Sequence, residues 1–230
     1  MSRIVMSLAA RATLLILAVS VCAAAQTRTL AVYAGPANGL DTESGSALQW
    51  ELQRLLAPAG LELLWKASVD RKSGDDFDFV VVGSFRGSCS VVEVPPPPSG
   101  ALEPASLAET SVADGRILPF LDVDCGRVLQ MLRPQLDPLD LRSRQAAFGR
   151  ALGRVIAHKI YHIVAQTAEH HDTGVTKAAL STRDLTTPRL EFDAWSVARM
   201  RPPSVVPSST AEGVAAGRYS VRPANDWFLK

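Results

Sequence analysis

The chain lacks several signals that would assign it a common chemistry. Its 230 residues contain no basic run and carry a formal net charge of only +1, which excludes a typical nucleic-acid-binding surface. No glycine-rich phosphate loop follows a predicted strand, and Ser88-Cys89-Ser90 lacks the strand-to-helix context of a nucleophile elbow. What remains is a chain of ordinary globular composition, 47% hydrophobic and 20% charged, for which we predict one α/β (α+β) domain.

The first 25 residues have the pattern of a secretory signal peptide. Arg3 and Arg11 give a positive start, a short apolar run follows, and Ala23-Ala24-Ala25 fits a small-x-small cleavage site. We expect cleavage before Gln26, a secreted or periplasmic protein, and no transmembrane span in the mature chain. An uncleaved anchor is the alternative. A lipoprotein attached through Cys22 is disfavoured because Val21 stands where a small residue is needed.

Cysteine is scarce, and signal cleavage would leave only Cys89 and Cys125. In an oxidising compartment two such residues favour one disulfide, and two separate buried thiols are the alternative. A bridge of this span would contribute about 3–4 kcal/mol to stability.

Runs of apolar and β-branched residues predict four strands, and the FDFVVV run is expected near the centre of a sheet. The predicted strands cover 29–34, 61–65, 77–82 and 117–123. Amphipathic spacing predicts a helix over 46–57, and a shorter helix is expected over 127–132, before Pro134. The segment of about 94–109 is proline-rich and is predicted to be an extended, exposed insertion.

A long helix is predicted from Leu141 or Ser143 to Thr167, with Ser143 as a reasonable N-cap. Its apolar face is wide, so most of the helix should be buried. Gly149 and Gly153 would let another element approach its backbone closely. A short helix is expected over 178–185. We place the domain at 26–195 and a poorly ordered tail at 196–230.

All four histidines of the chain lie within 14 consecutive residues. His158 and His162 are four residues apart, so their side chains project from adjacent turns of one helix face. The chain then leaves the helix, and either His170 or His171 can fold back as a third ligand. Three neutral imidazoles with an open fourth position suit zinc. The alternative is that the histidines are only polar groups of a core helix.

The segment from Leu152 to Val175 resembles the active-site helix of small secreted zincin-type proteins of bacteria, whose pattern is H-E-x-x-H with a third His further on and then Gly-Leu or Gly-Val. The resemblance implies a zincin-like domain, in which a mixed β-sheet packs against the metal-site helix. It also implies zinc ligands at His158, His162 and His170. The strand and cysteine of 114–125 fit the same comparison. The third His comes eight residues after the second rather than six, which excludes a plain metzincin assignment.

The chain departs from that pattern at the residue after the first His. Zincins have a glutamate there, which takes a proton from the metal-bound water, whereas this chain has Lys159. A protonated lysine is no base and adds a positive charge beside the metal. Glu169 is next to the third ligand, but that position does not aim it at the same water, and Asp172 is a further candidate for a carboxylate that contacts a ligand. A methionine that often follows the Gly-Leu step is also missing, since Val175 and Thr176 stand there.

Three functions follow from these observations. The first is an exported zincin-like protein that keeps a three-His zinc site and has impaired or lost peptide hydrolysis, with a peptide or protein as its candidate ligand. The second is an active metallopeptidase with an unusual base, such as a neutral Lys159. The third is a binding or structural module without metal. The acidic pairs Asp75-Asp76 and Asp122/Asp124 are interpreted as solvated turns or strand ends rather than as an acid/base pair.

Overall fold

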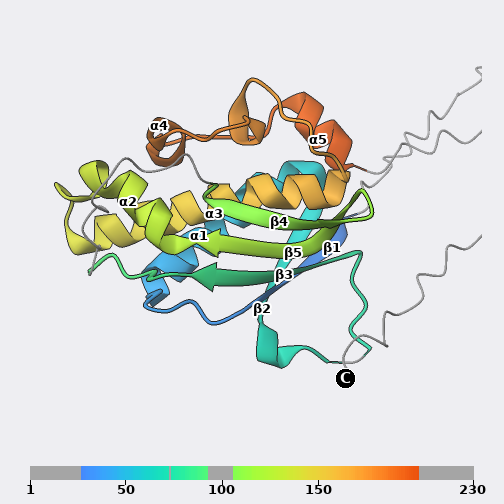
Figure 1. The fold of residues 1–230 in the computed structure, drawn as a ribbon, viewed down its shortest axis with the longest axis horizontal. Helices are drawn as coiled ribbons and strands as arrows, with labels where there is room; N and C mark the ends of the chain where they lie inside the picture. Colours follow the sequence, from blue (N-terminus) through green and yellow to red (C-terminus); the bar gives the residue numbers. More distant parts are fainter. Residues whose placement is uncertain (1–26, 73, 93–105, 202–230) are drawn as a thin grey trace, which may run out of the picture.

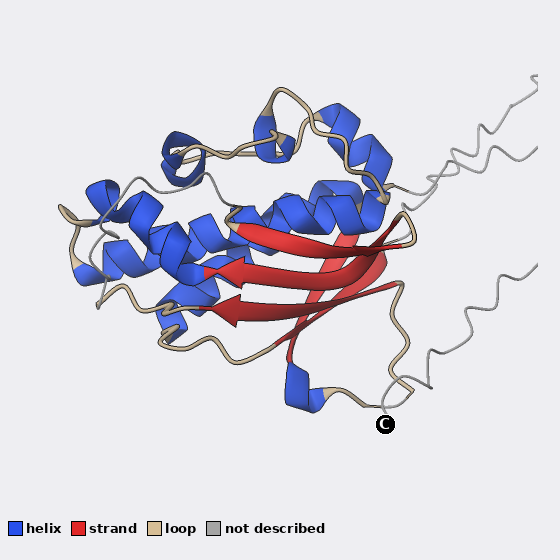
Figure 2. Ribbon diagram, viewed as in Figure 1, coloured by secondary structure: helices blue, strands red, loops and turns tan. Residues whose placement is uncertain are grey.

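The computed structural model describes residues 27–72, 74–92 and 106–201, which form a mixed sheet with helices packed against it (Figures 1 and 2). The strands are β1 (Arg28–Ala34), β2 (Leu61–Ala67), β3 (Phe79–Arg86), β4 (Ala108–Ala113) and β5 (Arg116–Asp124). Their order is β2-β1-β3-β5-β4, and all neighbours are parallel except β4 and β5. The prediction of a mixed sheet packed against a long helix is confirmed, with β3 at the centre.

Each predicted strand is present with shifted bounds, but β4 was not predicted. Ala108 and Glu109 belong to this strand, so the expected insertion ends earlier than residue 109; residues 93–105 lie outside the described part of the chain. β4 reads AETSVA, which has little of the apolar alternation that marks a strand. It forms because Asp114 and Gly115 both take positive φ and turn the chain back into an antiparallel hairpin with β5.

The helices are α1 (Thr42–Leu56), α2 (Cys125–Leu136), α3 (Leu141–Ala165), α4 (Thr182–Thr186) and α5 (Ala194–Met200). One-turn 3₁₀ segments occur at Ala57–Ala59, Ser68–Asp70 and Gly174–Thr176. None of the helices among the described residues is long and apolar enough to cross a bilayer.

α3 begins at Leu141, one of its two predicted starts, whereas its predicted N-cap, its predicted end and the predicted end of α2 are wrong for local reasons. Ser143 is not the N-cap of α3, because the Asp140 carboxylate accepts a hydrogen bond from the Ser143 backbone N–H and thereby caps the helix. At the other end Gln166 adopts a left-handed conformation, so α3 stops at Ala165 rather than Thr167. α2 runs through Pro134 to Leu136, since one proline in the last turn removes only one hydrogen-bond donor.

The domain also extends past the predicted boundary at residue 195. Asp193 caps α5 by accepting from the backbone N–H of Ser196, and Ser196 and Met200 are buried. The ordered part therefore reaches at least Arg201. The predicted signal peptide (1–25) and the rest of the predicted tail (202–230) lie outside the described residues.

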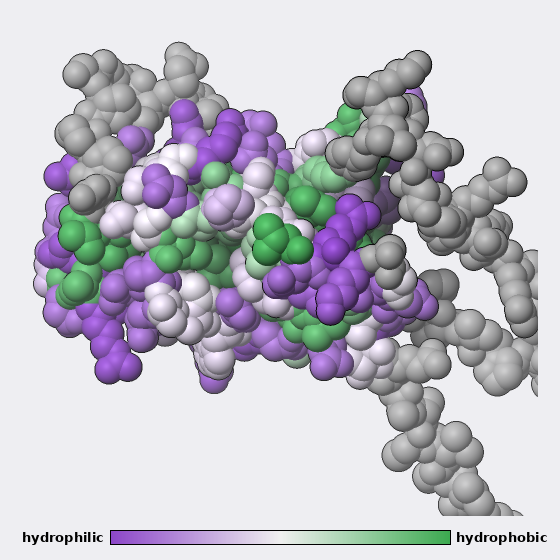
Figure 3. Space-filling view, turned by 90° about the horizontal axis from the view of Figure 1, so that it is seen from below, coloured by the Kyte–Doolittle hydropathy of each residue, from purple (hydrophilic) through white to green (hydrophobic). Residues whose placement is uncertain are grey.

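Helices cover one face of the sheet, and side chains alternate accordingly. In β3, Val81 is fully buried under the helices while Val80 on the opposite face is 36% exposed. Phe120 of β5 is likewise exposed on that second face. Viewed from below, the surface shows hydrophobic patches broken up by hydrophilic side chains (Figure 3).

The predicted disulfide is present. Cys89, in the segment after β3, is bonded to Cys125 at the first residue of α2. The bridge ties the end of the central strand to a helix that also packs on α3. Both cysteines are fully buried.

Helices α1 and α3 approach each other so closely that no side chain fits at the contact. A Cβ added to Gly149 would lie 2.2 Å from the backbone oxygen of Ser44, and one added to Gly153 would lie 2.9 Å from that of Leu48. The predicted role of both glycines is confirmed. The same contact buries the ion pair between Arg154 and Glu51, with an N–O distance of 2.7 Å.

We expect Gly149→Ala to destabilise the protein by about 1–3 kcal/mol, because backbone rather than a flexible side chain occupies the space that the methyl group needs. Gly45→Ala is the matched control in the partner helix. There the nearest atom, Cδ2 of Leu40, is 4.0 Å away, and a gain of about 0.5–1 kcal/mol is expected. Urea unfolding measures both changes. Equal midpoints for the two variants would contradict the close contact.

Candidate metal centre

The next-to-last turn of α3 presents His158, and the last turn presents His162. Both imidazoles are buried, with exposed fractions of 6% and 5%, because the flanking residues of the helix belong to the core. His158 and His162 therefore face the same interior site, as their spacing predicted.

Backbone carbonyls fix the orientation and the tautomer of both rings. Nδ1 of His158 lies 2.7 Å from the oxygen of Val175, and Nδ1 of His162 lies 2.6 Å from the oxygen of Thr167. A carbonyl can only accept, so each Nδ1 carries the proton and donates. In the neutral rings each Nε2 is then left with a free lone pair, as in histidines that bind a metal through Nε2.

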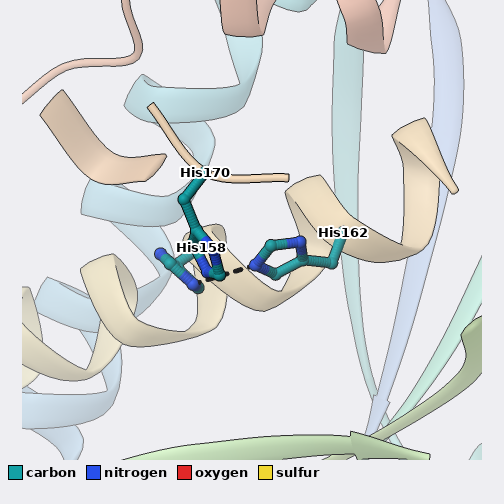
Figure 4. Close-up of side chains that lie close together, drawn as sticks. All are labelled: His158, His162 and His170. Atoms are coloured by element: carbon teal, nitrogen blue, oxygen red, sulfur yellow. Dashed lines mark hydrogen bonds between the residues drawn. The ribbon is translucent and has the colours of Figure 1, made fainter. Parts of the chain in front are cut away.

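The two Nε2 atoms face each other at 3.0 Å, and the ring of His170 closes the third side of the cluster (Figure 4). The His170 ring centroid is 4.8 Å from that of His162 and 5.3 Å from that of His158. One nitrogen from each histidine lies within 4.8 Å of the others. His170 itself is exposed, so it stands at the open side of the cluster.

The electrostatic environment keeps the cluster uncharged. Burial lowers the pKa of His158 to about 3, more than the Val175 carbonyl raises it, and the nearby His162 and Lys159 lower it further. Burial is also the main reason that the pKa values of His162 and His170 are lowered. At neutral pH the three rings are therefore uncharged rather than cationic.

The loop after α3 brings His170 to the cluster and turns His171 away from it. The backbone N–H of His171 donates to the oxygen of Thr176, and its ring stacks on Trp195 and pairs with Asp193. The reversal occurs at Gly174, which has positive φ, and a Cβ there would lie 2.3 Å from the oxygen of Glu191. Of the two candidates for a third ligand, the structure brings His170 to the other histidines.

Lys159 lies beside the cluster on the wall of a cleft of about 350 Å³. Burial lowers the pKa of Lys159, and the Glu109 carboxylate on β4 opposes that effect. The cleft is lined by Ser106, Leu107, Ala108, Val155, His158, Lys159, Ala178, Ala179 and Leu180. The walls of this cleft were not predicted from the sequence, because 106–108 was interpreted as part of the insertion and 178–180 carries no chemical signal.

No carboxylate of a described residue joins the three histidines. Glu169 pairs with Arg199 at 3.0 Å, and Asp172 is exposed. Asp75 pairs with Lys66, and Asp122 pairs with Arg86, both in the sheet region and outside the histidine cluster. In the described part of the chain, the group of three potential metal ligands thus consists of histidines alone.

No protein-family model matches the sequence, and no match was found among curated proteins. Among solved structures, the chain is similar to archaemetzincin from Methanopyrus kandleri, with a TM-score of 0.46 and 10% sequence identity. The match covers 78% of this chain and 96% of the other. A TM-score this low carries no functional argument, so any assignment of function depends on the geometry of the site.

Proposed function

We propose that this chain is an exported zincin-like protein that binds one zinc ion through His158, His162 and His170 and has weak or no peptidase activity. The observation that carries the proposal is the 3.0 Å approach of two Nε2 atoms whose rings already donate through Nδ1. Two lone pairs held face to face repel each other unless a cation lies between them. The arrangement is the one expected of a ligand pair.

A proton is the other cation that would relieve this repulsion, and it corresponds to the alternative of a metal-free core. It would require an imidazolium in a site where burial lowers the pKa of His158 to about 3 and lowers that of His162 as well. A buried imidazolium without a carboxylate partner is unfavourable at neutral pH. The environment therefore favours a metal ion over a shared proton.

The donor set fits zinc. Three imidazoles with a fourth position open is a common catalytic zinc arrangement, and ligands at about 2.0–2.1 Å from a tetrahedral ion lie about 3.3 Å apart. The buried pair is close to that separation, and the exposed His170 has room to adjust. When bound, zinc would supply a Lewis acid that polarises a carbonyl or a water.

The proposed loss of hydrolysis rests on Lys159. General-base catalysis typically contributes 10²–10⁴-fold, and an ammonium group cannot accept a proton. Glu169 does not replace the missing carboxylate, because it pairs with Arg199. The lowered pKa of Lys159 is the one observation that favours the second candidate, an active peptidase with a neutral lysine as base.

Export is supported by the Cys89–Cys125 disulfide, because such bridges persist mainly in oxidising compartments. We propose residues 1–25 as the cleaved signal peptide, so that the mature protein begins at Gln26. Sequencing the N-terminus of the exported protein tests this assignment, and an intact Met1 on an exported chain would contradict it.

Metal analysis of the purified mature protein tests the central proposal. We expect one zinc ion per chain at neutral pH, removed by a chelator and restored by dialysis against zinc. Because zinc would bind only the folded chain, a free concentration of 100 times Kd should stabilise it by about 2.7 kcal/mol. A protein that neither holds zinc nor gains stability from it is instead a module without metal.

A further inference from the structure

The cleft beside the histidines combines one cation with apolar walls. Its volume is about 350 Å³, and Lys159 and His158 are the titratable groups of its lining. Leu107 of the segment leading into β4, Val155 of α3 and Leu180 supply apolar surface. Lys159 is the one lysine or arginine of the lining, and no aspartate or glutamate accompanies it there.

Lys159 differs from the other lysines that the structure pairs. Lys66 forms an ion pair with Asp75 at 3.0 Å, and Lys177 forms one with Asp184 at 2.7 Å. No carboxylate of a described residue forms an ion pair with Lys159, and Glu109 acts on it only through a longer-range attraction. A partly buried ammonium group without a counter-ion favours an anionic ligand.

We infer that the cleft binds the C-terminal carboxylate of a peptide, with Lys159 as its counter-charge and the last side chain against the apolar walls. A volume of about 350 Å³ is at the small end of the range for ligand sites, which suits the end of a chain better than a segment passing through. This inference deepens the proposed function and rests on it for the position of the ligand beside the metal. The site would thus retain peptide ends rather than cut peptide bonds.

The test compares two probes that differ only at the terminus. Fluorescein-labelled Ala-Ala-Leu-Leu is prepared with a free carboxylate and as the amide, and anisotropy measures binding to the zinc-loaded protein and to the protein after chelation. We expect the acid to bind about 10- to 100-fold more tightly than the amide, as for a charge-assisted hydrogen bond. Lys159→Met should abolish the preference, and Lys159→Arg should retain it.

Lys72→Met is the matched control, because Lys72 is exposed and its loss changes the net charge equally. It should leave the preference intact. Equal binding of acid and amide, or a preference that survives Lys159→Met, overturns the inference. So does an amidated peptide with an acidic side chain that binds as tightly as the free acid. Zinc content is measured separately, so absent zinc contradicts the proposed function, while bound zinc without a terminal preference contradicts only the inference.

Discussion

Replacing His170 with alanine is expected to lower the zinc affinity by more than about 100-fold, since loss of a direct ligand should exceed the 10–100-fold typical of outer contacts. His170 is exposed and meets the cluster only through its ring, so its removal leaves the core untouched. His162→Ala should lower the affinity at least as much. That ring is buried, however, and the variant also frees the Thr167 carbonyl. Competition with a chelator of known affinity measures the zinc affinity of both variants.

His171→Ala is the control for this experiment. It removes the neighbouring histidine, whose ring contacts Trp195 and Asp193 rather than the cluster. We expect its zinc affinity to stay within a few-fold of the wild type, because only the position of the loop is perturbed. If His171→Ala loses zinc and His170→Ala keeps it, the ligand assignment in the loop is reversed. Thermal melting of all three variants shows whether any loss of zinc reflects unfolding.

The parts of the fold that were predicted have strong local patterns. The β-branched run of β3 and the long apolar face of α3 identify a strand and a buried helix without any knowledge of their neighbours. The missed strand β4 is polar and short, and its pairing is decided by the turn at Asp114 and Gly115 and by the presence of β5. Tertiary pairing of this kind overrides weak local preference.

The site, too, was predictable only where local geometry decides the arrangement. Four-residue spacing on one helix predicts that His158 and His162 share a face, because helix geometry alone decides it. No local rule decides whether His170 or His171 approaches the other two histidines. The choice is made by contacts of the loop with α5, where His171 meets Trp195 and Asp193. The carbonyls of Val175 and Thr167, which set the tautomers, were also beyond prediction because any residue supplies the same oxygen.

Lys159→Glu is expected to create or raise peptide hydrolysis by about 10²–10⁴-fold, the usual contribution of a general base. The substitution places a carboxylate next to His158 and removes the positive charge that disfavours a dication there. It also leaves Glu109 nearby, and two carboxylates would raise each other's pKa. The combination with Glu109→Gln should therefore shift the pH profile of the gained activity toward lower pH. Cleavage of a quenched fluorescent peptide library, with and without chelator, measures each rate.

Lys159→Gln separates the two effects of that substitution, because it removes the charge without providing a base. If it gains as much hydrolysis as Lys159→Glu, relief of repulsion rather than proton transfer explains the gain. Chelator-sensitive cleavage by the wild type, lost in Lys159→Gln, would favour the second candidate, in which the lysine itself is the base. A Lys159→Glu protein that binds zinc as well as the wild type and still cleaves no peptide shows that the comparison with zincin active sites is wrong. The three histidines would then form a zinc site that does not share the catalytic geometry of zincins.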